Sequence, residues 1–460
     1  MKQEIKDALI EITGPENYTD KLIDLVSYSY DASDYSSRPD CAVWIASTDQ
    51  VSRILALADR ERIAVVPRGA GTGLAGLSVP LQGGIVLDMT RMNRIINICI
   101  PDRLAVVQPG VIYDQFQAAL APHGFFFPPD PASGRVCSLG GNVGTNAGGL
   151  HGAKYGTTRD YVLGLEIVLA GGEIMRTGAR TMKSSSGYDL TKLFVGSEGT
   201  LGVTTEITLK ICPKPTVTAT ATATFDCLED AGDAVTLVMH SGITPSVLEL
   251  IDGNTITMFR KHTDLDLPPG DVMILAETDG LTQEDVQYQM DRLVDLFREC
   301  KAREIQRAKS TKEAERLWSV RRALGAMTGQ VMPNQAPEDV TVPMSRISEF
   351  LRKTEEISKK HGLLILNYGH AGDGNLHPNV LYDASDPKQA AALKPTLLDL
   401  HKLASDLGGT LTGEHGIGIT KAPYMSLEHD PVALKVMRSV KRALDPHNIL
   451  NPGKMALDDE

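Results

Sequence analysis

Pro-Arg-Gly-Ala-Gly-Thr-Gly-Leu-Ala-Gly, residues 67–76, is the stretch that decides the fold of this 460-residue chain. It follows the apolar run Ile63–Val66, which predicts a short buried strand. Its glycines lack a Cβ, so the backbone can turn tightly and lie close to a bound molecule with its N–H groups exposed. Such a nest of donors suits a pyrophosphate, and Arg68 adds a positive charge. An ordinary loop between a strand and a helix is the alternative interpretation.

The composition excludes several classes of partner. The net charge is −12 and no basic tract occurs, which argues against nucleic acid and anionic membrane surfaces. The six cysteines are scattered without a Cys-x-x-Cys pair, which argues against an iron–sulfur cluster or zinc ribbon and suits a reducing cytosol. No apolar signal segment or run of about 18 apolar residues occurs. We therefore expect a cytoplasmic protein that reaches the inner membrane, if at all, peripherally through a partner.

Two further glycine clusters follow in the same half of the chain. Residues 139–149 read Leu-Gly-Gly-Asn-Val-Gly-Thr-Asn-Ala-Gly-Gly, which predicts a second loop in close contact with a ligand. Residues 196–202 read Gly-Ser-Glu-Gly-Thr-Leu-Gly, and residues 127–131 read Phe-Pro-Pro-Asp-Pro, a rigid turn. Three glycine-rich segments in one region indicate one extended ligand, longer than a mononucleotide.

The second half of the chain has a different pattern. Residues 210–216 predict a linker, and Thr216–Phe225 alternates Thr with Ala or Val, which is typical of a strand with one small apolar face. Strand–helix–strand patterns between residues 228 and 407 predict an α+β domain with an antiparallel sheet and helices on one face. Asp445–Lys454 is a turn-rich closing segment.

Two histidine-containing turns are candidates for metal binding. Residues 369–379 read Gly-His-Ala-Gly-Asp-Gly-Asn-Leu-His-Pro-Asn, so a tight turn can bring His370 and His377 together at neighbouring strand ends. Residues 412–418 read Thr-Gly-Glu-His-Gly-Ile-Gly and expose Glu414 and His415. Two imidazoles and a carboxylate suit a divalent transition metal with open positions. Structural histidines are the alternative.

Together these motifs resemble the FAD domain of the vanillyl-alcohol-oxidase-type flavoproteins. Their order and spacing are similar to those of the branch that contains the glycolate oxidase flavin subunit and the D-lactate and D-2-hydroxyglutarate dehydrogenases. The resemblance covers nearly the whole chain and implies an α+β protein: a two-part FAD-binding domain of the PCMH type plus an α+β cap domain with an antiparallel sheet. It implies an FAD-binding domain at 1–213, a substrate or cap domain at 214–411, and a C-terminal segment at 412–460 that returns to the FAD domain.

The resemblance also implies which residues contact FAD. In the family the first glycine loop binds the pyrophosphate, and the other two clusters run along the adenosine and the flavin. Many relatives attach FAD covalently through a His in the first loop, but residues 67–84 contain none, so we expect dissociable FAD. The implied FAD-binding residues are Pro67, Arg68, Gly69, Ala70, Gly71, Thr72, Gly73, Leu74, Pro131, Ser138, Gly141, Asn142, Thr145, Asn146, Gly148, Gly149, Glu198, Gly199, Gly202, Val203 and Asn451.

Further residues receive roles in catalysis from the same resemblance. His370, His377 and Glu414 match ligands of zinc, iron or manganese, and Asn379 matches a neighbour of the substrate. The family places a substrate arginine in a Trp-x-x-Arg setting, which points to Arg321 as the clamp of a carboxylate; a solvated helix face is the alternative. We expect His415 to remove the hydroxyl proton while the metal stabilises the alkoxide and the hydride passes to flavin N5.

The chain departs from the hydroxyglutarate pattern at two places. Gly325 stands where that group has a Thr, and Pro337 and Glu338 precede Asp339 where that group has a Lys two residues before the Asp. These contacts would hold a distal carboxylate. A small monocarboxylate, D-lactate or glycolate, therefore fits better than a diacid.

Three hypotheses remain open at this stage. The first is an FAD-linked D-2-hydroxyacid dehydrogenase, with the D-2-hydroxyglutarate type as its variant. Its family passes electrons to an iron–sulfur subunit, an electron-transferring flavoprotein, a quinone or a cytochrome, and a homodimer is left open. The second is a colourless metallohydrolase with a His/His/Glu site. The third is an electron-relay subunit whose flavin the substrate cannot reduce.

Overall fold

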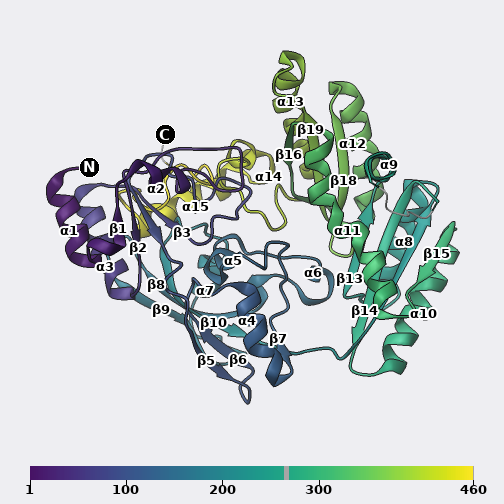
Figure 1. Cartoon of the computed structure of the whole chain (residues 1–460), viewed down its shortest axis with the longest axis horizontal. Coiled ribbons are helices and arrows are strands. Elements are labelled where there is room, and N and C mark those ends of the chain that lie inside the picture. Colours follow the sequence, from purple (N-terminus) through teal and green to yellow (C-terminus); the bar gives the residue numbers. More distant parts are fainter. Residues whose placement is uncertain (264–268, 459–460) are drawn as a thin grey trace. The chain divides into compact units, whose positions relative to one another are not determined.

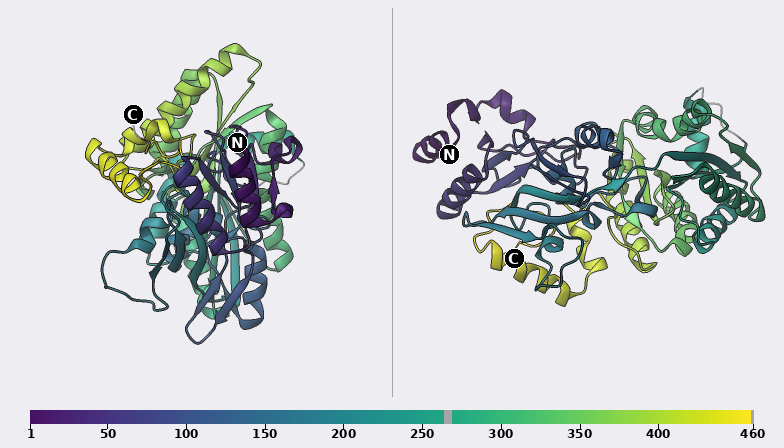
Figure 2. Two further views of the ribbon diagram at one scale, coloured as in Figure 1. Left: turned by 90° about the vertical axis from the view of Figure 1, so that its left-hand side faces the viewer. Right: turned by 90° about the horizontal axis from the view of Figure 1, so that it is seen from below.

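The computed structural model describes residues 1–263 and 269–458, and it leaves the side chains of residues 325–327 and 330 undescribed (Figures 1 and 2). The chain forms two compact units. Unit 1 comprises Met1–Gly148, Thr157–Lys214 and Glu414–Glu460, and unit 2 comprises Gly149–Gly156 and Pro215–Gly413. Unit 2 thus takes residues 149–156 from the middle of the predicted first domain.

Unit 1 contains two sheets. The first has the order β1-β2-β4-β3, with β2 and β3 both parallel to β4, and the second is antiparallel with the order β5-β6-β10-β8-β9. A short pair, β11 with β7, lies apart from both. The strands are β1 (Tyr18–Thr19), β2 (Cys41–Trp44), β3 (Val65–Arg68), β4 (Ile85–Asp88), β5 (Ile95–Cys99), β6 (Leu104–Val107), β7 (Phe125–Phe126), β8 (Val162–Val168), β9 (Ile174–Gly178), β10 (Val203–Lys210) and β11 (Cys212–Pro213).

The α-helices of unit 1 cover these sheets. They are α1 (Gln3–Thr13), α2 (Leu22–Ser27), α3 (Thr48–Glu61), α4 (Tyr113–Leu120), α5 (Leu139–Thr145), α7 (Leu190–Phe194), α14 (Met425–Glu428) and α15 (Pro431–Leu444). Helix α3 forms because Ser47 caps its first turn and apolar residues recur on one face. That face, with Val51 and Ile54, is buried in a core with Val43 and Leu87.

The C-terminal segment completes the first sheet of unit 1. The N–H of Val65 donates to the carbonyl of Ile449 at 2.7 Å, and the N–H of Asn451 donates to the carbonyl of Val65 at 2.8 Å. The buried Lys441 ammonium donates to the carbonyls of Thr200 and Leu450. These bonds hold the closing turn beside the strand that leads into the first glycine loop.

Unit 2 is built on one antiparallel sheet with the order β15-β12-β14-β13-β18-β19-β16, and β17 also pairs with β19. Its strands are β12 (Val217–Phe225), β13 (Val247–Ile251), β14 (Val272–Gly280), β15 (Glu304–Arg307), β16 (Asn334–Pro337), β17 (Val340–Thr341), β18 (Leu364–His370) and β19 (Asn375–Tyr382). Its α-helices are α6 (Gly152–Tyr155), α8 (Leu228–His240), α9 (Gly253–His262), α10 (Gln283–Glu299), α11 (Thr311–Val331), α12 (Ile347–His361) and α13 (Pro387–Asp406).

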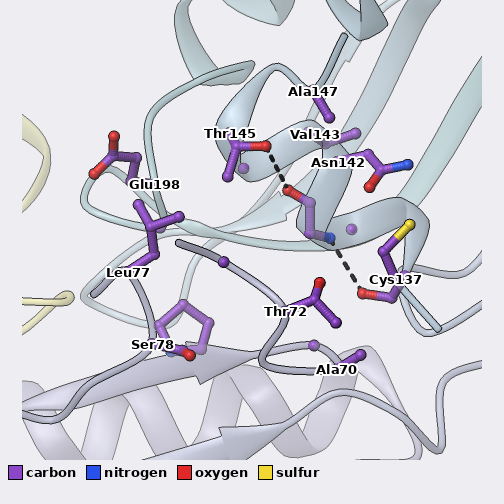
Figure 3. A pocket seen from close by; sticks show the side chains of 18 of the residues that line it. Ala70, Thr72, Leu77, Ser78, Cys137, Asn142, Val143, Thr145, Ala147 and Glu198 are labelled. Atoms are coloured by element: carbon purple, nitrogen blue, oxygen red, sulfur yellow. Dashed lines mark hydrogen bonds between the residues drawn. The ribbon is translucent and has the colours of Figure 1, made fainter. Parts of the chain in front are cut away.

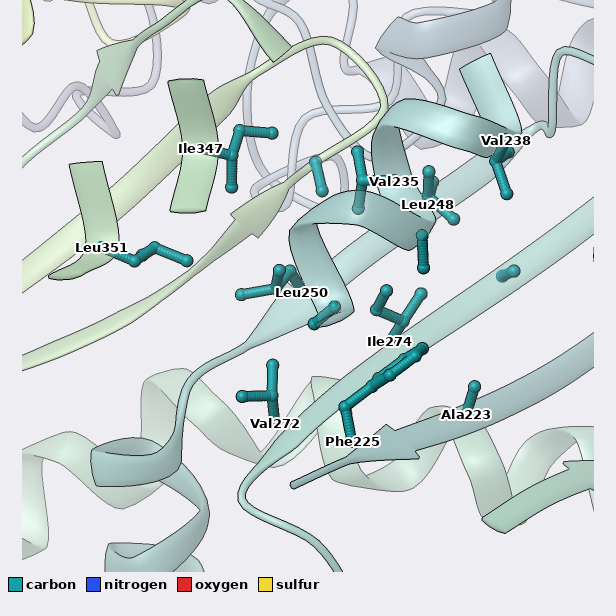
Figure 4. Close-up of a cluster of buried hydrophobic side chains, with 14 of the residues drawn as sticks. Ala223, Phe225, Val235, Val238, Leu248, Leu250, Val272, Ile274, Ile347 and Leu351 are labelled. Carbon is teal, nitrogen blue, oxygen red and sulfur yellow. The ribbon is translucent and has the colours of Figure 1, made fainter. Parts of the chain in front are cut away.

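The side chains of strand β12 alternate between the two faces of this sheet. Ala221, Ala223 and Phe225 are buried in the core under α8, α10 and α12 (Figure 4). Thr220 points to the opposite face, where its hydroxyl donates to Glu277 on β14 at 3.0 Å. Because side chains alternate along a strand, one strand contributes a packed face and a polar face.

The expectation of helices on one face of the sheet is wrong. A second apolar cluster joins Ile251 and Met273 of the sheet to Phe259 of α9 and Leu324 of α11. In their strands, Ile251 follows Leu250 and Met273 follows Val272, and both Leu250 and Val272 belong to the main core. Because neighbouring side chains in a strand point to opposite faces, Ile251 and Met273 face away from that core. Helices α9 and α11 therefore cover part of the polar face and bring their own side chains to it.

Candidate functional site

The first glycine loop begins where β3 ends at Arg68. The Arg68 guanidinium is buried and donates to the carbonyl of Tyr30 at 2.8 Å, the hydroxyl of Ser78 at 3.0 Å and the carbonyl of Ser27 at 3.3 Å. Burial lowers its pKa, and the nearby acids oppose that effect. A Cβ on Gly71, which has φ +70, would lie 2.2 Å from the guanidinium. Arg68 therefore holds the loop in place, besides lying in the wall of the site.

The second glycine cluster is not the predicted loop but the short helix α5. The Ser138 hydroxyl accepts from the N–H of Gly141 at 3.3 Å and caps the helix, and Asn146 ends it at φ 56. A Cβ on Gly140 would lie 2.5 Å from Pro109. The glycines thus permit close packing against a neighbouring segment. Their low intrinsic helix propensity misled the sequence prediction, because tertiary packing overrides it.

A cavity of about 480 Å³ lies within unit 1 between these segments (Figure 3). Ala70 and Thr72 from the loop face Asn142 and Thr145 from α5 across it. The predicted residues that line it are Pro67, Arg68, Gly69, Ala70, Gly71, Thr72, Gly73, Leu74, Pro131, Ser138, Gly141, Asn142, Thr145, Glu198, Gly199, Gly202 and Val203. Glu414 and His415 also line it.

The other predicted cofactor residues do not line this cavity. Asn146 accepts from the N–H of Arg159 at 2.8 Å, and Gly149 belongs to unit 2. A Cβ on Gly148 would lie 2.9 Å from the Glu414 carboxylate. The Asn451 amide donates to the carbonyls of Leu77 and Glu198 at 2.9 and 2.7 Å. Asn451 therefore holds the wall of the cavity in position.

Sequence reasoning missed much of the lining. Some of these residues lie inside the quoted glycine clusters but were not singled out there, and the others lie outside any motif and reach the cavity through packing. They are Leu77, Ser78, Met89, Pro109, Ala132, Ser133, Cys137, Gly140, Val143, Gly144, Ala147, Phe194, Ser197 and Thr204.

The cavity fits a large polar cofactor with an apolar ring system. Its volume lies within the roughly 300–1,000 Å³ of typical ligand sites. The buried side chain of Asn142 lies in its wall and adds a polar group to the lining. A Cβ on Gly144 would meet no atom of the described residues within 4 Å, so Gly144 borders open space in the cavity.

Glu198 fixes the turn that carries His415. Its two carboxylate oxygens accept from the N–H groups of Ile417 at 2.6 Å and Gly418 at 2.9 Å. Burial raises the pKa of Glu198 to about 7, although these two N–H groups and the nearby Lys421 and Lys454 act in the opposite direction. The turn is therefore attached to the cavity wall through one buried carboxyl group.

In unit 2, the structure brings His370 and His377 together. His370 ends β18, and His377 on β19 lies opposite Tyr368 in the register. The two imidazoles face each other with their Nε2 atoms 3.3 Å apart. Both are buried.

Each imidazole has a carboxylate at its other nitrogen. His370 Nδ1 bonds to the Oε1 of Glu249, and His377 Nδ1 lies 3.6 Å from the Oδ1 of Asp339. Burial raises the pKa of Glu249, but His370 and Arg321 outweigh it and lower the pKa to about 2. Sequence reasoning missed Glu249; an acid inside the apolar run Val-Leu-Glu-Leu-Ile at 247–251 was the available signal.

This arrangement fits a metal cation. A histidine ligand usually donates its second N–H to a carboxylate, which fixes the ring and its tautomer. The Glu249 bond at His370 Nδ1 leaves the Nε2 lone pair of His370 directed toward Nε2 of His377. Two nitrogens about 2.1 Å from one cation at a tetrahedral angle lie about 3.4 Å apart, close to the observed spacing.

The remaining predicted residues of unit 2 lie on the same polar face. Arg321 Nε bonds to the Oε2 of Glu249, and the Arg321 guanidinium lies 5.5 Å from the ring centre of Tyr368. Asn379 is buried and donates to the side chain of Gln335 at 2.9 Å. Asp339 accepts from the hydroxyl of Thr412 at 2.6 Å and the N–H of Gly413 at 2.9 Å, which fixes the residue before Glu414 in the chain.

The residues at the two departures from the hydroxyglutarate pattern lie in different parts of unit 2. Glu338 is buried, and its Oε2 lies 3.2 Å from His401 Nε2 within unit 2. Pro337 ends β16, opposite Asn379 on β19. Gly325 lies in α11 but outside the residues whose side chains are described.

Two global features bear on the predicted compartment. All six cysteines are free thiols. Among the described residues, no helix combines the length and the apolar character that crossing a bilayer requires.

The chain is similar to known families and proteins over nearly its whole length. The family described as "FAD linked oxidases, C-terminal domain" matches residues 214–455, and the "FAD binding domain" family matches residues 39–178. Glycolate oxidase subunit GlcD of Bacillus subtilis is 40% identical over 99% of this chain and 97% of its own length. D-lactate dehydrogenase of Anaerostipes hadrus is 33% identical over 91% of this chain and 90% of its own length.

Solved structures agree on the fold. A p-cresol methylhydroxylase with bound substrate superposes with a TM-score of 0.81 at 19% identity, covering 99% of this chain and 97% of that one. A 4-ethylphenol oxidase from Gulosibacter chungangensis gives 0.78 at 20% identity, covering 98% and 96%. The predicted fold class is confirmed by this likeness and by the FAD-binding family match.

Proposed function

Because this chain belongs to the FAD-linked oxidase family, we propose that it oxidises a small D-2-hydroxy acid, D-lactate or glycolate, to the 2-oxo acid. The chain is an FAD-linked oxidoreductase of the glycolate oxidase and D-lactate dehydrogenase type. The observation that carries the finer proposal is the pair of imidazoles with facing Nε2 atoms, placed on the same polar face as the partly buried Arg321.

The cofactor of this reaction is FAD, held without a covalent bond in the cavity of unit 1. When bound, FAD supplies a two-electron acceptor for the hydrogen that leaves the substrate Cα. The loop after β3 and the glycines of α5 shape the cavity, and the buried Asn142 side chain lies in its wall. Residues 67–84 offer no His for covalent attachment.

The second group is a divalent cation, zinc, iron or manganese, with His370, His377 and Glu414 as ligands. Such a cation would supply Lewis-acid stabilisation of negative charge on the hydroxyl oxygen of the substrate. The facing Nε2 atoms support the histidine pair. Glu414 is supported by its place in the sequence, directly after Gly413. The N–H of Gly413 donates to Asp339, and Asp339 lies near His377.

The chain's own side chains provide binding and proton transfer. Arg321 binds the substrate carboxylate, because a guanidinium pairs with a carboxylate through two parallel N–H bonds. His415 takes the hydroxyl proton on a ring nitrogen. Asn379 contacts and orients the substrate. The place of His415 in the cavity wall, fixed by the Glu198 bonds, supports its role as the base.

The absence of a lysine at Pro337 supports a small substrate. Pro337 stands where the hydroxyglutarate-type pattern has a lysine, so this position offers no cation to a distal carboxylate. For this reason the D-2-hydroxyglutarate type is the second candidate only.

The electrons then leave to a separate acceptor. Relatives are named as subunits of glycolate oxidase, which supports a partner protein such as an iron–sulfur subunit or an electron-transferring flavoprotein; a quinone is the alternative. We place this chain in the cytoplasm, with contact to the inner membrane through that partner.

An anaerobic titration of the purified protein tests this function. D-lactate and glycolate should bleach the flavin absorbance, and L-lactate and D-2-hydroxyglutarate should not. A colourless protein would favour the metallohydrolase, and a yellow protein that none of these acids bleaches would favour the electron relay. Arg321→Met should raise the KM for D-lactate, and Arg322→Met, a change at the exposed next residue, should leave it within about twofold.

A further inference from the structure

Glu249 is a fully buried carboxylate between two groups to which the proposed function gives separate roles. It lies in the middle of β13, directly opposite His370 in the register with β18. Arg321 reaches it from α11, which covers the same face of the sheet. A strand, its neighbour and a helix thus meet at one carboxylate.

Each oxygen of this carboxylate serves one donor. Oε1 bonds to His370 Nδ1, and Oε2 bonds to Arg321 Nε. An ionised carboxylate only accepts, so His370 Nδ1 must carry the proton, and the lone pair is then on Nε2. The same group therefore determines the tautomer of one side chain and the orientation of the other.

We propose that Glu249 is a positioning residue that joins the metal subsite to the carboxylate subsite. It holds His370 with Nε2 ready to bind the cation, and it holds the Arg321 guanidinium at a fixed place on the same face. This inference rests on the proposed function. Its consequence is that one substitution in unit 2, at a residue that does not line the cofactor cavity of unit 1, weakens metal binding and substrate binding together.

A neighbouring carboxylate provides a matched control. Glu277 on β14 is partly buried, lies on the same face and also receives a bond from α11, at 3.1 Å from Trp318 Nε1. It also accepts from the hydroxyl of Thr220 at 3.0 Å. Trp318 and Thr220 have no role in the proposed chemistry, so Glu277→Gln removes a carboxylate from the same face without touching either subsite.

The experiment compares Glu249→Gln, Glu249→Asp and Glu277→Gln with the wild type. Glutamine retains one acceptor oxygen, so it serves one of the two donors and turns its own amide toward the other. Metal is removed with a chelator and Zn²⁺ or Co²⁺ is titrated by calorimetry, with the visible bands of Co²⁺ as a second readout. KM and kcat for D-lactate follow on the metal-loaded proteins.

Loss of a carboxylate behind a metal-binding histidine typically weakens metal affinity 10- to 100-fold. We expect such a loss in Glu249→Gln with an increased KM, a smaller loss in Glu249→Asp, and values within about twofold of the wild type in Glu277→Gln. Unchanged metal affinity in Glu249→Gln would overturn the inference. So would equal losses in Glu277→Gln, or loss of flavin and cooperative unfolding in both Glu249 variants, which indicate a structural role. Failure of the wild type to bind metal would instead overturn the metal part of the proposed function.

Discussion

The buried carboxyl group of Glu198 should make the stability of unit 1 depend on pH. Burial raises its pKa from 4.5 to about 7, against the two backbone N–H bonds from Ile417 and Gly418. The folded state therefore keeps a proton that the unfolded chain releases. The stabilisation is fully present below pH 4.5 and is lost as the pH rises through about 7, and the rise corresponds to about 3 kcal/mol.

The substitution Glu198→Gln removes this titration. The free energy of unfolding of the wild type should fall relative to the variant by about 3 kcal/mol between about pH 5 and about pH 8. Taking the difference between the two proteins cancels the titration of all other groups. Glu173→Gln, at an exposed turn of the same unit, serves as the control and should follow the wild type.

Urea unfolding of the flavin-free protein provides the measurement. The chain has two tryptophans, Trp44 in unit 1 and Trp318 in unit 2, so a Trp318→Phe background leaves Trp44 to report on unit 1 alone. Separate reporting is needed because a chain of two units need not unfold in one transition. Parallel pH curves for wild type and Glu198→Gln would refute the reasoning.

Three further outcomes are expected. Ser138→Ala, which removes the cap of α5, should cost about 1 kcal/mol of stability and weaken FAD binding in a fluorescence titration, whereas Ser47→Ala, the same change at the cap of α3, should cost a similar amount and leave FAD affinity unchanged. Acid precipitation should release all the FAD into the supernatant; flavin that stays with the pellet would contradict non-covalent binding. His415→Ala should stay yellow but resist reduction by D-lactate, with His429→Ala as the control, and normal reduction of His415→Ala would remove its role as the base.

Periodic patterns allowed much of unit 2 to be predicted from the sequence. Helix α12, Ile347–His361, belongs to the strand–helix–strand patterns predicted between residues 228 and 407, because its apolar spacing and the glycine after it indicate a helix without tertiary information. The Thr/Ala alternation of residues 216–225 indicated a strand with two different faces. The turn between His370 and His377 was predictable because glycines mark a tight reversal between two strand patterns.

What sequence could not supply is packing between segments far apart in the chain. Helix α5 was predicted as a loop because its glycines disfavour a helix until Pro109 packs against them. The role of Arg68 in holding the loop depends on carbonyls some forty residues earlier. The contacts of Glu249 could not be predicted, because they arise only when the sheet pairs Glu249 with His370 and α11 brings Arg321 to it.

The most direct test of the central claim is the rate of flavin reduction in metal-free protein. After treatment with a chelator, the protein should remain yellow, and D-lactate should fail to bleach it in an anaerobic stopped-flow experiment. One equivalent of Zn²⁺ or Mn²⁺ should restore bleaching in the wild type but not in His377→Ala. Bleaching of the metal-free wild type at the full rate would contradict the claim that His370, His377 and Glu414 hold a cation that activates the substrate hydroxyl.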